Sequence, residues 1–203
     1  MIPTSVIEHL GKEPRIAPLV VRYTPRPRPD HGGDVYFGLL RSITYQQLSG
    51  KAAGAIFQRF LDLFPDSYPH PEQLLELSET DLRAVGMSRP KARYLHEAAE
   101  FWLAHKLINQ DWEQLSDQEI TDLLTQIKGV GQWTVEMVLM FVLKRPDLLP
   151  LDDLVVRRNL IKLFGLQELR GKKLTQAMIA AAEPWRPYRS YASRYLWELG
   201  YTR

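Results

Sequence analysis

Two glycines interrupt an apolar helical pattern in the stretch IKGVGQWTVEMVLMFVL, residues 127–143. Gly129 and Gly131 can adopt a positive φ and let another molecule approach the backbone closely. The helix that follows begins with backbone N–H groups that have no partner within it, at the positive end of its dipole. This combination binds anions, and phosphate above all. A Gly-x-Gly by itself more often marks a tight turn between helices, so the rest of the chain must decide.

Composition excludes several kinds of chemistry. The 203 residues include no cysteine, which excludes disulfides, cysteine-liganded zinc, thiolate nucleophiles and cysteine-held iron–sulfur clusters. No apolar run approaches the ~20 residues of a membrane helix. The first residues lack the apolar core of a signal peptide. We therefore expect no membrane contact and a cytoplasmic protein, associated with the nucleoid if bacterial. The formal net charge of +2 permits nucleic-acid binding without arguing for it.

Helical periodicity covers nearly the whole chain, and no segment alternates as a strand would. Residues 24–33, TPRPRPDHGG, form a stiff connector followed by a turn, and Pro146 and Pro150 force a loop. The pattern predicts helices at 34–46, 49–64, 71–76, 79–85, 89–105, 116–127, 132–144, 152/153–164, 172–183 and 188–200, with a further turn at 111–115. We expect an all-α protein of roughly ten to twelve short helices.

Two segments of the chain share a layout. LSETDLRAVGMSRPKARYL and LSDQEITDLLTQIKGVGQWTVEMVL each combine Leu-Ser, an acid three residues after the Ser, a short apolar helix, a glycine turn and a second helix. SDQE in the second segment is a capping box, which starts a helix. Either short helix-turn-helix units simply look alike, or the chain holds two hairpins, the second intact and the first degenerate.

Four blocks in order, between residues 34 and 201, resemble the helix-hairpin-helix DNA glycosylase superfamily. KGVGQWT is similar to its phosphate-binding hairpin, and LLPLDDLVVRRNL to its proline loop and aspartate. SITYQQLSGKAA resembles the helix-loop-helix that carries a Gln pair into DNA. PWRPYRSYASRYLWELGY resembles the C-terminal helix of the alkylbase branch. The best match is the 3-methyladenine DNA glycosylase II, or AlkA-like, branch.

The resemblance implies one glycosylase unit made of two helical lobes that flank a cleft. The first lobe would span about residues 34–130, and the second about 131–203 together with residues 1–33. The β-rich N-terminal lobe of some longer members is not expected.

The resemblance places the catalytic carboxylate on Asp153 and makes Asp152 the better helix cap, although the two roles could be exchanged. A fixed carboxylate stabilises an oxocarbenium-like transition state and orients or deprotonates the attacking water. Trp133 stands where members with lyase activity carry a Schiff-base lysine. The resemblance therefore implies a monofunctional enzyme that uses water and leaves an abasic site.

The resemblance also implies a base pocket with the indoles of Trp133 and Trp197 as walls. Alkylation at N3 or N7 makes a purine cationic, and an aromatic face attracts a cation. Met137 and Leu154 would line the same pocket. Met137 stands where a relative carries tyrosine, which changes the shape of the pocket. Each of these four residues could instead be an ordinary core residue.

A base that leaves the helical stack must be replaced by a side chain. By resemblance, Gln47 is this wedge and Gln46 its neighbour, facing the lesion or the opposite base. Arg157 and Arg158 either contact DNA or are merely solvated. The expected contacts to DNA phosphate are Lys128, Gly129, Val130, Gly131 and Thr134, with Ser88 and Lys91 as weaker candidates in the degenerate hairpin.

The family often places a monovalent cation between the hairpin carbonyls and the phosphate, so Na⁺ or K⁺ is expected at Gly129–Gly131 and no other cofactor. The sequence thus predicts a monomeric glycosylase for alkylated purines of the 3-methyladenine and 7-methylguanine type in double-stranded DNA. Two alternatives stay open: a non-catalytic helix-hairpin-helix DNA-binding protein, and a glycosylase for another damaged base.

Overall fold

The computed structural model describes residues 2–26 and 32–201, with side chains to residue 199. Residues 27–31 of the expected connector lie outside the described residues. In the two described ranges every regular element is a helix and no strand occurs, so the all-α expectation is confirmed. None of the helices described there is both long and apolar enough to cross a membrane.

The chain divides into two compact units. Unit 1 comprises Met1–Pro29 and Lys144–Arg203, and unit 2 comprises Asp30–Leu143. The boundary falls after Leu143, whereas the sequence suggested about residue 130. The reason is that both helices of the glycine-containing hairpin pack inside unit 2, so the chain leaves this unit only at the loop of Pro146 and Pro150.

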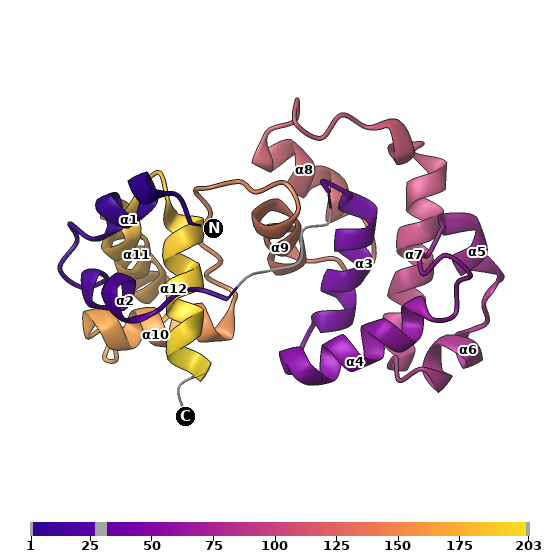
Figure 1. Ribbon diagram of the computed structural model, residues 1–203, viewed down its shortest axis with the longest axis horizontal. Coiled ribbons are helices and arrows are strands. Elements are labelled where there is room, and N and C mark those ends of the chain that lie inside the picture. Colours follow the sequence, from indigo (N-terminus) through magenta and orange to yellow (C-terminus); the bar gives the residue numbers. More distant parts are fainter. Residues whose placement is uncertain (1, 27–31, 202–203) are drawn as a thin grey trace. The chain divides into compact units, whose positions relative to one another are not determined.

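Unit 2 is built around helix α3, which packs against α4, α7 and α9 (Figure 1). Leu39, Leu40 and Ile43 of α3 are fully buried. Gly38 permits the close packing, because a Cβ there would lie 2.3 Å from a methyl group of Val142. The elements of this unit are α3 Val35–Tyr45, α4 Gly50–Leu61, α5 Pro71–Glu76, α6 Glu79–Ala84, α7 Arg89–Ala104, the 3-10 helix η1 Leu107–Asn109, α8 Asp117–Leu124 and α9 Gln132–Phe141.

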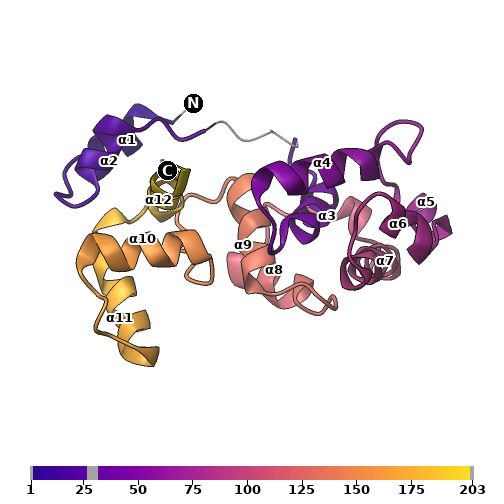
Figure 2. The ribbon, with the colours of Figure 1, turned by 90° about the horizontal axis from the view of Figure 1, so that it is seen from below.

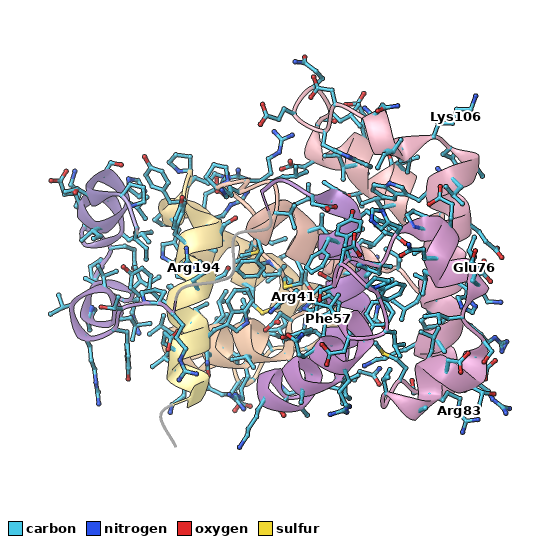
Figure 3. All side chains as sticks on the ribbon, turned by 45° about the vertical axis from the view of Figure 1, so that its right-hand side comes forward. Arg41, Phe57, Glu76, Arg83, Lys106 and Arg194 are labelled. Atoms are coloured by element: carbon cyan, nitrogen blue, oxygen red, sulfur yellow. The ribbon has the colours of Figure 1, made fainter. Side chains whose placement is uncertain are left out.

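Polar and apolar side chains separate on the helices of unit 2. The labelled Glu76, Arg83 and Lys106 extend into solvent, whereas Phe57 packs inward (Figure 3). This is the amphipathic pattern that the periodicity of the sequence predicts.

Unit 1 packs α10 between α11 and α12, and α2 also contacts α12 (Figure 2). Its core includes Leu10, Leu160, Trp185 and Leu196, all fully buried. The sequence predicted no helix near the N-terminus, because α1 and α2 are only seven and six residues long. The elements are α1 Thr4–Leu10, α2 Ala17–Arg22, α10 Leu154–Phe164, α11 Gly171–Ala182, the 3-10 helix η2 Glu183–Trp185 and α12 Arg189–Tyr201.

Caps explain why most predicted helix limits are confirmed within a few residues. Asp34 accepts a hydrogen bond from the Phe37 N–H at 2.9 Å, Ser116 and Glu119 form the predicted capping box, and Gly165 ends α10 with φ 68°. The predicted helical turn at 111–115 does not form: residues 112–115 form bends, and the 3-10 helix lies earlier, at Leu107–Asn109.

Candidate active site and DNA-contacting residues

Asp153 is the N-cap of α10, and three donors converge on one of its carboxylate oxygens. Oδ1 accepts the N–H of Val155 at 3.0 Å, the N–H of Val156 at 2.9 Å and the indole Nε1–H of Trp197 at 2.9 Å. The expectation that Asp152 caps this helix is therefore wrong. The chain turns through a bond from the Asp153 N–H to the Pro150 carbonyl, which leaves Asp152 exposed outside the helix.

These contacts suit a fixed negative charge. Hydrogen bonds to an ionised carboxylate are stronger than neutral ones, and the start of a helix favours a negative group. Asp153 is half-buried, so solvent screens its charge only in part. The orientation of the carboxylate is set by the helix on one side and by Trp197 on the other.

The loop before Asp153 is attached to the start of α12 by charged and polar side chains. Arg189 donates from Nε to Asp147 Oδ1 at 2.7 Å and from Nη2 to Oδ2 at 3.0 Å, and Arg186 donates to Oδ2 at 2.6 Å. Burial by itself raises the pKa of Asp147. The hydrogen bonds and charges of these arginines outweigh burial and hold the pKa of Asp147 below its ordinary value. Ser190 donates to the Arg145 carbonyl at 2.8 Å.

Helix α12 therefore positions Asp153 at two places, through the loop at its start and through Trp197 near its end. Asn159 adds a buried bond from α10 to the Leu196 carbonyl at 2.7 Å. Sequence reasoning missed Asp147, Arg189 and Asn159. The available signal was the pair of arginines in RPYRS, which could bind the acidic residue of the proline loop.

The two predicted pocket residues of unit 1 differ in exposure. Leu154 is 81% exposed beside Asp153, so its side chain is accessible to a ligand. Trp197 is only 6% exposed, and its described polar contact is with Asp153. The structure thus gives Trp197 a contact that the sequence did not suggest, with the carboxylate itself.

In unit 2, the glycine-containing hairpin consists of α8, the turn at 125–131 and α9, here called the second hairpin. Gly129 has φ 86°, and a Cβ there would lie 2.2–2.4 Å from the Tyr94 ring of α7. Glycine is required at this position for both reasons. Gly131 has φ −99°, which any residue can adopt, so the expectation of a positive φ holds only for Gly129.

Gly131 acts through its lack of a side chain. It is the N-cap of α9 and makes no side-chain cap bond, so no side chain of the cap covers the start of the helix. Lys128 is exposed beside the turn. Val130 and Thr134 are 5% and 2% exposed, so their side chains lie inside the unit.

The two glutamines after α3 have different surroundings. Gln46 donates from Nε2 to the Gly129 carbonyl and to Thr134 Oγ1, both at 2.9 Å. Gln47 is exposed and has φ 56°, a left-handed conformation that is unfavourable for a residue other than glycine. Trp133 is half-buried, and Met137, one turn later on α9, is 8% exposed.

The two weaker candidates for phosphate contact are engaged with the protein. Lys91 donates from Nζ to the carbonyls of Thr44 at 2.8 Å and Gln46 at 2.7 Å. The hydroxyl of Ser88 accepts the Lys91 N–H at 3.4 Å and caps α7.

Two backbone carbonyls of the expected cation site already accept hydrogen bonds from the protein. The Gly129 carbonyl accepts from Gln46, and the Gly131 carbonyl accepts the N–H groups of Thr134 and Val135. A carbonyl oxygen has two lone pairs, so Gly129 retains capacity for a cation. Among the described residues no cluster of three or more His, Asp or Glu side chains could hold a metal ion.

Residues 40–187 match the family described as HhH-GPD superfamily base excision DNA repair protein. The chain belongs to this superfamily. DNA-3-methyladenine glycosylase 1 of Schizosaccharomyces pombe is 36% identical over 91% of this chain and 80% of its own length. The alkylbase DNA glycosidase-like protein mag2 of the same organism is 34% identical over 87% of this chain and 82% of its own.

A solved structure is similar to this chain over nearly its full length. The structure of the S. pombe 3-methyladenine DNA glycosylase Mag1 in complex with abasic DNA has a TM-score of 0.85 and 34% identity, and covers 97% of both chains. The superfamily match ends at residue 187, before Trp197, whereas the Mag1 similarity spans nearly the full chain. The superfamily region therefore contains the hairpin, the glutamine pair and Asp153.

Proposed function

We propose that the protein is a monofunctional DNA glycosylase. It hydrolyses the N-glycosidic bond of alkylated purines, of the 3-methyladenine and 7-methylguanine type, in double-stranded DNA and leaves an abasic site for base excision repair. The observation that carries the proposal is the Asp153 carboxylate, held by three donors, in a superfamily member whose relatives are named 3-methyladenine glycosylases.

The reaction requires stabilisation of positive charge on the sugar. As the C1′–N9 bond breaks, its electron pair moves to the cationic purine, which leaves as a neutral base. The Asp153 carboxylate stabilises the oxocarbenium-like sugar and orients the water whose oxygen forms the new bond to C1′. The proton of this water passes to the carboxylate or to solvent. Alkylation has already made the purine a good leaving group, so little acid catalysis is needed.

Trp133 supports hydrolysis over a lyase reaction. A lyase forms a Schiff base with an amine at this position of the hairpin, and the indole of Trp133 offers none. The half-buried indole also suits a cationic, electron-poor base, which an aromatic face attracts by about 0.5–2 kcal/mol.

The second hairpin supports the proposal that the protein binds duplex DNA as a monomer. Its uncapped helix start offers backbone N–H groups to a phosphate, and Lys128 adds an exposed positive charge. A Na⁺ or K⁺ ion belongs to the same proposal: the Gly129 carbonyl would hold it, and it would supply positive charge for a phosphate. Replacing K⁺ by a large organic cation at constant ionic strength should then weaken DNA binding.

The test is incubation with duplex DNA that carries 7-methylguanine or 3-methyladenine, followed by alkali, which cleaves the strand at abasic sites. The wild type should release the base, and Asp153→Asn should lower the rate at least about a hundredfold. Asp152→Asn is the matched control, since Asp152 is exposed and outside the helix, and it should be close to wild type.

Each alternative has its own signature in this experiment. Binding without base release by the wild type would indicate a non-catalytic DNA-binding protein. Release of deaminated or oxidised bases, but not of alkylated purines, would indicate a different lesion. Strand cleavage without alkali would overturn the monofunctional assignment.

A further inference from the structure

Two helical hairpins of unit 2 have the same local design. The first hairpin consists of α6, the turn at 85–88 and α7, and it matches the second hairpin in order and capping. Each begins with a capping box, Ser78 with Asp81 and Ser116 with Glu119. Each turn has a glycine with positive φ, Gly86 at 104° and Gly129 at 86°. Each glycine is followed by a buried apolar residue, Met87 or Val130.

The hairpins differ at the start of the second helix. In the first, the Ser88 hydroxyl accepts the Lys91 N–H, and Pro90 has no N–H at all. In the second, Gly131 has no side chain to cap with. The Ser88 cap and Pro90 therefore leave the first hairpin two fewer backbone N–H groups for a phosphate, even though its geometry is otherwise similar.

The third helical residue after each cap contacts the same residue, Gln46. In the first hairpin this residue is Lys91, whose ammonium binds the backbone carbonyl of Gln46 at 2.7 Å and that of Thr44 at 2.8 Å. In the second it is Thr134, whose hydroxyl accepts the side-chain amide of Gln46 at 2.9 Å. Gln46 is thus held at its backbone by one hairpin and at its side chain by the other.

The contacts of Lys91 complete the end of α3. The last carbonyls of a helix have no donor within it, and the Lys91 ammonium supplies one to Thr44 and Gln46. Burial lowers the pKa of Lys91, so these carbonyls are what stabilises its charge inside the protein. Tyr94, one turn further along α7, packs its ring on Gly129 and joins the two hairpins directly.

We propose that the first hairpin is a clamp for the wedge segment, defined as residues 45–48, and that Lys91 is its main positioning residue. Lys91 and Thr134 hold Gln46 from two sides, and this keeps the neighbouring Gln47 in its left-handed conformation. A residue other than glycine keeps such a φ only when its surroundings enforce it. The proposal rests on the proposed function for the role of Gln47 as a wedge.

The clamp has a specific consequence for binding. A pre-ordered Gln47 enters the gap left by a displaced base without a further loss of conformational freedom. Without Lys91, the wedge segment must be ordered during binding. Affinity for DNA with a gap in the stack should fall, whereas affinity for intact duplex, which uses the second hairpin and not the wedge, should be unchanged.

The first test compares Lys91→Met with Lys106→Met, a substitution of an exposed lysine in the same unit. Affinity is measured for a duplex with a tetrahydrofuran abasic analogue and for the undamaged duplex. Lys91→Met should lower the ratio of the two affinities about tenfold, and Lys91→Arg should restore part of it. Lys106→Met should change neither affinity.

A double-mutant cycle with Gln47→Ala shows whether Lys91 acts through the wedge. If it does, the double variant loses no more affinity for the abasic analogue than Gln47→Ala alone. Additive losses, or an unchanged affinity ratio in Lys91→Met, would overturn the proposal. Thermal unfolding of each variant separates this effect from a general loss of stability.

Hydrogen exchange without DNA provides a test that does not depend on the proposed function. Backbone amides at 44–49 should exchange faster in Lys91→Met than in the wild type and Lys106→Met. Unchanged exchange would overturn the clamp. If these amides respond as expected but the wild type releases no alkylated base, the glycosylase assignment fails and the clamp stands.

Discussion

The two compact units have opposite charge. Unit 1 has seventeen Lys and Arg and eight Asp and Glu, a net charge of +9, whereas unit 2 has nine and sixteen, a net charge of −7. The net charge of +2 for the whole chain conceals this difference. The acidic unit holds the second hairpin and the wedge segment, and the basic unit holds Asp153.

Under the proposed function, one of the two units that contact the polyanion is itself acidic. Backbone N–H groups at an uncapped helix start act over a short distance and do not depend on the net charge around them. Side-chain charges act at longer range and steer association. We infer that the basic unit attracts DNA, while the acidic unit fixes its register through the backbone and Gln47.

The largest expected effect separates chemistry from binding. Asp153→Asn in unit 1 should lower base release at least about a hundredfold, because the amide carries no charge to stabilise the sugar cation. Affinity for undamaged duplex should not fall, because one negative charge near DNA has been removed. A single-turnover assay together with fluorescence anisotropy measures both, and a parallel loss of binding would contradict the separation.

The next effect compares two glycines with positive φ, one in each unit. Gly129→Ala combines an unfavourable φ with a Cβ 2.2–2.4 Å from the Tyr94 ring, whereas Gly165→Ala meets nothing within 4 Å. Gly165→Ala should cost about 1 kcal/mol in free energy of unfolding, and Gly129→Ala at least about 2 kcal/mol more. Urea denaturation provides the measurement; equal losses would show that the Tyr94 contact is unimportant.

A smaller effect compares the two tryptophans. Trp197→Phe keeps an aromatic ring but removes the donor to Asp153, so the rate of base release should fall about tenfold with DNA affinity unchanged. Trp133→Phe keeps a face for the base and should change the rate only about two- to threefold. The reverse order of the two rates would indicate that Trp197 does not position Asp153.

The smallest effect concerns salt. Replacing Arg157 and Arg158 of the basic unit by Gln should reduce the slope of log affinity against log salt by about 2 if both contact phosphate. Arg83→Gln with Lys106→Gln, two exposed changes in the acidic unit, serve as the control and should leave the slope unaltered. Equal slopes for both pairs would place the long-range attraction elsewhere.

Local signals in the sequence predicted the elements well, because a cap acts within one turn. Asp34, Ser116 and Gly165 begin or end their helices as expected. The same signals failed where two residues compete locally. Asp152 and Asp153 are equally good caps by residue type, and the turn from Pro150, together with Trp197, decides for Asp153.

Contacts between residues far apart in the chain were beyond prediction. Nothing in the sequence indicates that the Lys91 ammonium donates to the carbonyl of Gln46, 45 positions away. Lys91 was therefore interpreted as a phosphate contact. The hydrogen bond from Arg189 to Asp147 was missed for the same reason. Such contacts depend on how helices pack, which residue type and spacing do not specify.

The sequence by itself determined the all-α fold, the open glycine turn and the absence of an amine at Trp133, since these depend on residue type and on neighbours in the chain. Only the tertiary structure decided which aspartate is held by three donors. It also decided that Gln46 is hydrogen-bonded to the second hairpin while Gln47 is exposed. The physical reason is that hydrogen-bond geometry must be satisfied in three dimensions. α12 for Asp153 and α7 for Gln46 supply donors that no local pattern contains.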